Sequence, residues 1–124
     1  MPVDHRRALG AAGEAAVERW YLDAGYQLLD RNWRCREGEL DLVVSRRREV
    51  VFCEVKTRRS DAYGTPVEAV TLVKQRRLRV LASRWLSDHP GIRAGALRFD
   101  VASVLAPRDA PLVVDVLEAA FENF

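Results

Sequence analysis

The segment GELDLVVSRRREVVFCEVKTR, Gly38 to Arg58, contains two short apolar runs joined by a basic turn. The turn is too short for a crossover helix, so the runs predict two antiparallel strands, over 39–45 and 50–57. The segment decides the fold because it predicts a strand pair that belongs to a core. The charged residues that interrupt these strands are Glu39, Asp41, Glu54 and Lys56.

The apolar residues of the two strands predict their register. Alternate side chains share a face in a strand, so the apolar residues of each strand should lie on one side and its charged residues on the other. Pairing the two apolar faces requires Leu42 opposite Cys53 and Leu40 opposite Val55. A slip by one residue would place a carboxylate on the apolar face, which is strongly disfavoured.

The same register places charged side chains opposite one another. Glu39 would face Lys56 in an ordinary cross-strand ion pair, and Asp41 would face Glu54. Two carboxylates about 5 Å apart at an effective dielectric near 20 repel each other by roughly 3 kcal/mol. A divalent cation, a shared proton or a neighbouring arginine would each compensate for this repulsion.

The rest of the chain predicts an α/β or α+β fold, with a sheet covered on both faces. Helical periodicity and strand patterns predict two helices and three further strands, over 6–24, 71–88, 26–33, 97–105 and 112–117. Thr65 to Glu68 has the spacing of a capping box and predicts the start of a helical turn. The tail that follows Leu117 predicts a last turn of helix. Gly10 and Gly13, close to Glu14 in the first helix, predict a close neighbour on that side of the helix.

Length and composition limit the protein class. A chain of 124 residues predicts one domain, 1–124. We expect a cytoplasmic protein, because the sequence has no apolar run long enough for a membrane span and no signal peptide at its start. Cys53 is interpreted as a core residue, whereas Cys35 receives no role. Residues 31–84 hold 14 Arg or Lys and 7 Asp or Glu, which fits either a solvated surface or a face that binds a polyanion.

Together these charged groups indicate chemistry on a phosphodiester. A cation held by Asp41 and Glu54 would polarise a phosphoryl group and activate a bound water. Lys56 could position that water or stabilise the charge that grows on the phosphate. Glu14, on the first helix, could bind a second cation, although tight helix packing explains its glycine neighbours equally well.

Asp41 followed by Glu54-Val55-Lys56 resembles the PD-(D/E)XK signature of restriction-endonuclease-like nucleases, with Leu40 in the place of the proline. More of the chain resembles the YraN family of bacterial proteins, which is similar to Holliday-junction resolvases. The segments that carry this resemblance are Gly10–Glu14, Asn32–Arg34, Gly38–Asp41, Glu54–Arg58, Tyr63–Val70, Lys74–Leu78 and Arg98–Val101.

The resemblance implies a restriction-endonuclease-like αβββαβ core, with a mixed central sheet and helices on both faces. It implies Mg²⁺ or Mn²⁺ at Asp41, Glu54 and the backbone carbonyl of Val55, with Glu14 joining the site. Lys56 would be catalytic. Gln75 would face the site, and a boundary residue on an amphipathic helix is the alternative for it.

The predicted function is that of a metal-dependent endonuclease that hydrolyses phosphodiester bonds of DNA, with branched recombination or repair intermediates as candidate substrates. Recognition would depend on DNA structure and not on sequence, without a membrane partner, and the resemblance leaves a homodimer open. The alternatives are a non-catalytic nucleic-acid-binding module of the same fold, or a structural strand pair whose acids arginine neutralises. The residues expected to contact nucleic acid are Arg34, Arg58, Arg59, Lys74 and Arg77.

Overall fold

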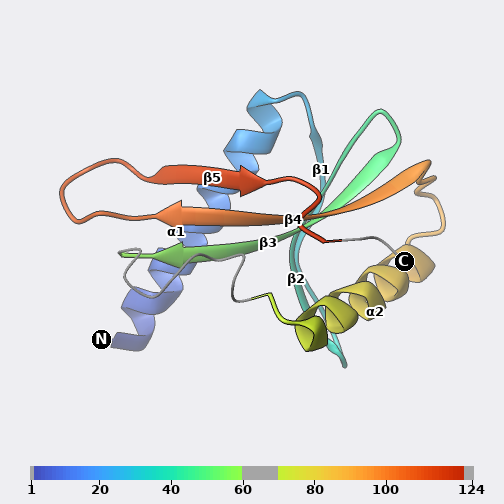
Figure 1. Ribbon diagram of the computed structural model, residues 1–124, viewed down its shortest axis with the longest axis horizontal. Coiled ribbons are helices and arrows are strands. Elements are labelled where there is room, and N and C mark those ends of the chain that lie inside the picture. The colour runs from blue at the N-terminus through green and yellow to red at the C-terminus, as the bar shows by residue number, and fades with distance from the viewer. Residues whose placement is uncertain (1, 60–69, 122–124) are drawn as a thin grey trace.

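Helices and strands follow one another in the order predicted (Figure 1). The computed structural model describes residues 2–59 and 70–121, so the helical turn predicted at Thr65 lies outside the described residues. Within the described ranges the elements are α1 Pro2–Asp23, β1 Gln27–Cys35, β2 Gly38–Arg46, β3 Glu49–Arg58, α2 Leu72–Asp88, β4 Ala96–Leu105 and β5 Val113–Leu117.

The strands form one mixed sheet in the order β1-β2-β3-β4-β5. β1, β2 and β3 are an antiparallel meander, β4 runs parallel to β3, and β5 is antiparallel to β4. The parallel pair needs a crossover connection, which contains α2. α1 and α2 pack on different sides of the sheet (Figure 1). The predicted α/β class and the αβββαβ order are therefore confirmed.

Each helix covers its own apolar core. The core under α1 includes Val17 and Tyr21 of the helix and Cys53 of β3, which confirms Cys53 as a core residue. The core under α2 is centred on Trp85, which is fully buried and packs against Phe52 of β3. Among the described residues, neither helix has the length and apolar character that a bilayer span requires.

The start of β2 departs from regular alternation. Leu42 and Val44 pack on the α1 side of the sheet, but Leu40 packs on the α2 side, so the prediction that the three share a face was wrong. The predicted pairing of Leu42 with Cys53 is confirmed, and it is the last pair of the β2–β3 ladder at this end. The predicted pairing of Leu40 with Val55 was wrong, because the ladder stops before it. β2 therefore parts from β3 at Asp41, while its pairing with β1 continues through Leu40.

The chain after β5 forms no helix within its described part. Ala119 has a positive φ of 52°, and its backbone N–H donates to Asp100 Oδ1 at 3.0 Å. The next N–H, that of Ala120, donates to the carbonyl of Phe99 at 2.8 Å. The prediction of a last helical turn was wrong for residues 118–121, because these bonds tie the segment back to β4.

Gly13 lies where α1 approaches β3 closely. A Cβ built at Gly13 would lie 1.8 Å from Thr57 Oγ1 and 2.9 Å from Thr57 Cβ, so rotation of the threonine cannot make room. We expect Gly13→Ala to destabilise the protein by about 1–3 kcal/mol in urea unfolding, because α1 must move away from β3.

Gly10 provides the matched control, because a Cβ there would meet nothing within 4 Å. Gly10→Ala is expected to stabilise α1 by about 0.5–1 kcal/mol, since alanine loses less backbone entropy on folding. If the two variants shifted the unfolding midpoint in the same direction, the close approach at Gly13 would be the wrong explanation for that glycine.

Candidate functional site

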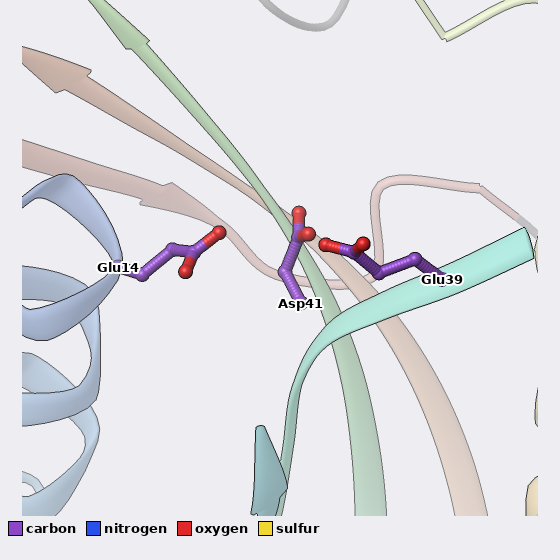
Figure 2. Close-up of side chains that lie close together, drawn as sticks. All are labelled: Glu14, Glu39 and Asp41. Carbon is purple, nitrogen blue, oxygen red and sulfur yellow. The ribbon is translucent and has the colours of Figure 1, made fainter. Parts of the chain in front are cut away.

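Three carboxylates converge where α1 meets the start of β2. Glu14 extends from α1, and Glu39 and Asp41 extend from β2 toward it (Figure 2). One oxygen from each lies within 4.8 Å of the others, and all three side chains are half-buried. The contact of Gly13 with β3 holds α1 close enough for Glu14 to reach the strand. We call these three residues the acidic cluster.

Asp41 occupies the place where the β2–β3 ladder stops. Its Oδ2 accepts a hydrogen bond of 2.8 Å from the backbone N–H of Val55, so the side chain substitutes for a missing ladder bond. Burial raises the pKa of Asp41 to about 6; the Val55 bond opposes this shift, and the charges of Glu54, Glu14 and Glu39 add to it. Burial and like charge together destabilise the ionised form.

The two other acids of the cluster have polar partners. Burial raises the pKa of Glu14, a hydrogen bond from the Asn32 side chain lowers it, and the charge of Glu39 raises it further. Glu39 forms a salt bridge of 2.9 Å with Arg34 of β1. The ion pair expected between Glu39 and Lys56 was therefore wrong, because Arg34 is the cation that reaches Glu39.

Glu54 belongs to a second group, which we call the lysine pair site: Glu54, Lys56 and Lys74. Glu54 Oε1 lies 2.6 Å from Lys74 Nζ and 3.5 Å from Lys56 Nζ. Burial lowers the pKa of Lys56, and the neighbouring Lys74 lowers it further. Burial also acts to lower the pKa of Lys74, but the hydrogen bond and charge of Glu54 outweigh it, so that this pKa is raised.

The two groups approach the sheet from different sides. Strand alternation places Glu54 and Lys56 on the same side as Phe52, which packs under α2. The acidic cluster lies on the α1 side, yet Glu54 contributes more than Glu14 or Glu39 to raising the pKa of Asp41. The groups thus meet at the end of the β2–β3 ladder. A single cation held between Asp41 and Glu54 stays a prediction.

The acidic cluster does not include four other residues predicted for the site: Gln75, Arg58, Arg59 and Arg77. The Gln75 side-chain amide donates to the carbonyl of Val70 at 3.2 Å, at the start of its own helix. Arg59 donates to the carbonyl of Ala106 at 3.4 Å. Arg77 is exposed on α2, with its Cδ 3.7 Å from where a Cβ of Gly38 would be. Arg58 is the last residue of β3.

Sequence reasoning missed two members of the centre. Glu39 was expected in an ion pair and not as a cation ligand, although its i, i+2 spacing from Asp41 predicts that the two share a face. Asn32 was recognised only as part of a family segment, and it has a positive φ of 51°. The strand β1 carries this residue toward Glu14, and no local pattern in the sequence indicates that contact.

Comparison with known proteins identifies the family. Residues 13–104 match the family described as "Uncharacterised protein family UPF0102". The chain is 49% identical to a UPF0102 protein of Frankia casuarinae, over 92% of this chain and 96% of the relative. It is 47% identical to one of Nocardia farcinica, over 96% and 93% of the two chains. The match includes both charged groups and the elements that position them, and the chain therefore belongs to the UPF0102 family, the YraN proteins of the restriction-endonuclease-like superfamily.

Proposed function

We propose that this protein is a metal-dependent endonuclease that hydrolyses phosphodiester bonds in DNA. The observation that carries the proposal is the acidic cluster, in which Glu14, Glu39 and Asp41 bring oxygens within 4.8 Å of one another next to two lysines. Among the described residues, no cationic nitrogen lies within 4.0 Å of the Asp41 carboxylate. Burial raises the pKa of Asp41 and repulsion from the neighbouring carboxylates raises it further, and a divalent cation would relieve that repulsion.

The donor set fits Mg²⁺ or Mn²⁺, because every donor is a carboxylate oxygen and hard cations prefer oxygen ligands. Asp41, Glu14 and Glu39 would hold the cation, with Glu54 and the Val55 carbonyl as further candidates. A bound cation would supply a nucleophilic hydroxide at neutral pH and neutralise charge on the phosphate.

The lysine pair site would act on the phosphate itself. Lys56 and Lys74 both contact Glu54, so two ammonium groups are held close together beside the acidic cluster. They would orient a phosphodiester and stabilise the negative charge that grows on its oxygens in the transition state. Because burial and Lys74 lower the pKa of Lys56, its ammonium would give up a proton more readily than that of an ordinary lysine.

The basic residues around the centre would bind the DNA backbone. Arg34 lies on β1, Arg58 ends β3, Arg59 follows it and Arg77 lies on α2, and arginine suits bidentate contact with phosphate. Contacts of this kind carry no sequence information, which favours a substrate recognised by its structure, such as a branched intermediate. A homodimer would place two such centres on one junction.

The test is cleavage of branched, flapped and linear DNA by the purified protein with Mg²⁺ or Mn²⁺. Asp41→Asn and Lys56→Met should each lose at least about 100-fold in rate, which is the usual cost of removing a charged catalytic group. Asp115→Asn is the control, because Asp115 is an exposed carboxylate on β5. Absence of cleavage, or equal activity in all variants, would refute the proposal.

A non-catalytic nucleic-acid-binding module remains the second candidate. It is favoured by the ion pairs that neutralise Glu54, since Lys74 lies only 2.6 Å from its carboxylate. This candidate predicts salt-sensitive DNA binding that persists in EDTA and in Lys56→Met, with no hydrolysis of any substrate.

Binding of Mn²⁺ should depend on pH through Asp41. Its pKa is raised to about 6, so the carboxylate is ionised at pH 8 and protonated at pH 5. The cation competes with that proton, and we expect affinity to fall by up to about tenfold per pH unit below pH 6. Calorimetric titration at pH 5, 6, 7 and 8 measures this. A profile that is flat between pH 5 and 7 would contradict the raised pKa.

A further inference from the structure

The turn between β2 and β3 carries three consecutive arginines at the end of the sheet opposite the β4–β5 connection (Figure 1). Arg46, Arg47 and Arg48 are all exposed, and we call them the arginine hairpin. They line an open hollow of about 590 Å³ together with Gly25, Gln27 and Ser45. The lining contains three cations and no carboxylate, so its electrostatic potential favours an anion.

The conformation of the turn makes these arginines unusual. Arg46 pairs with Glu49, which leaves Arg47 and Arg48 as a two-residue turn. Both have positive φ, 51° and 67°, a conformation that side chains with a Cβ adopt only at a cost. Hairpins of this type strongly prefer Asn-Gly at the two positions. The chain thus has two arginines at positions where Asn-Gly would give a more stable turn.

Contacts on both flanks hold the arginine hairpin in place. Arg46 donates to the carbonyl of Ala24 at 2.7 Å, and its guanidinium lies 4.2 Å from the centre of the Tyr26 ring. The carbonyl of Arg48 accepts a bond of 2.7 Å from the N–H of Gly95. A rigid, basic and open surface of this kind suits a polymer that lies across it better than a small ligand that must be enclosed.

We infer that the arginine hairpin binds the sugar–phosphate backbone of nucleic acid at a distance from the acidic cluster. The inference rests on the proposed function for the identity of the polymer. Asp41 and Arg47 are six residue steps apart along an extended strand, and six steps span about 20 Å. Duplex DNA advances 3.4 Å per base pair, so the same molecule spans both places with about six base pairs.

The test is DNA binding in EDTA, measured by fluorescence anisotropy at several salt concentrations with a branched duplex. In the full chain, Arg47→Asn combined with Arg48→Gly removes two charges and installs the preferred turn. We expect affinity to fall about tenfold at 150 mM salt, and the slope of log K against log salt to shrink by about 2. The melting temperature should rise by about 3 °C or more, which verifies that the variant is folded.

Two further variants separate position from charge. Arg6→Asn with Arg108→Asn removes the same net charge from exposed positions away from the hairpin, and it should leave the salt slope nearly unchanged. Arg47→Lys with Arg48→Lys keeps the charge and should restore most of the affinity. Equal losses in the hairpin and control variants would overturn the inference, because they would indicate a general charge effect.

The remaining outcomes distinguish this inference from the proposed function. DNA binding that requires the hairpin, without cleavage under any condition, would contradict the endonuclease and leave the inference standing. Cleavage and binding that are both unchanged in Arg47→Asn/Arg48→Gly would overturn the inference alone. Absence of DNA binding by the wild-type chain would overturn both. If the hairpin variant lost binding only to vesicles of anionic phospholipid, the partner would be a membrane and the inference would be wrong.

Discussion

Replacing Asp41 by asparagine should abolish Mn²⁺ binding and, at the same time, make the metal-free protein more stable at pH 8. The pKa of Asp41 is raised to about 6 in the folded protein, from 3.8 for the free side chain. Ionised Asp41 therefore costs folding free energy in full above pH 6; the cost shrinks as the pH falls from 6 and is gone below 3.8, where the carboxyl is protonated in both states. Asparagine is neutral at every pH, so the variant should gain about 2 kcal/mol at pH 8.

The asparagine can keep the local hydrogen bonds. Its side-chain oxygen can still accept from the N–H of Val55, and its amide can donate to the neighbouring carboxylates of Glu14 or Glu39. Thermal unfolding with and without Mn²⁺, at pH 4 and pH 8, measures both effects. Wild type should gain stability from Mn²⁺ at pH 8, and Asp41→Asn should not.

The control for this experiment is Asp115→Asn, which should respond to Mn²⁺ as the wild type does. Two results would contradict this account of Asp41, the first its unfavourable ionisation and the second its role as a cation ligand. One is a loss of stability in Asp41→Asn at pH 8. The other is an unchanged Mn²⁺ response in that variant, which would place the cation elsewhere in the protein.

Replacing Asp100 by alanine should cost about 3–5 kcal/mol of folding free energy, because it breaks a buried ion pair with Arg98 and removes the acceptor of the Tyr21 hydroxyl. The Asp100 side chain is fully buried, and its carboxylate accepts two hydrogen bonds of 2.8 Å from Arg98. It also accepts from the Tyr21 hydroxyl at 2.6 Å and from the N–H of Ala119 at 3.0 Å. One side chain thus joins α1, β4 and the segment after β5.

Urea unfolding of Asp100→Ala and of Asp115→Ala measures this effect against a matched surface position. Asp115 is exposed on β5, so its replacement should change stability by no more than about 0.5 kcal/mol. The free energy of unfolding of a domain of this size is about 5–15 kcal/mol in total, so Asp100→Ala should be close to unfolded at 37 °C. A loss below about 1 kcal/mol would show that the hydrogen bonds of Asp100 contribute little to the stability of the fold.

The elements and the strand register could be predicted because both follow from local patterns. The order of helices and strands is confirmed, as is the pairing of Leu42 with Cys53. Burial of one face makes a slip by one residue costly, so the apolar residues alone specify that register. Local patterns left α/β and α+β both open, and the parallel pair β3–β4, joined by the crossover that contains α2, decides for α/β.

The composition of the charged groups could not be predicted, because it depends on where β2 parts from β3 and where each helix docks. Leu40 packs under α2 and not with Leu42, so Asp41 faces Glu14 and Glu39 and not a regular neighbour on β3. Lys74 reaches Glu54 only because α2 packs across that side of the sheet. Strand alternation is a property of consecutive residues and can be read along the chain. The meeting of side chains from α1, β2, β3 and α2 is set by packing between distant segments, and only the tertiary structure decides it.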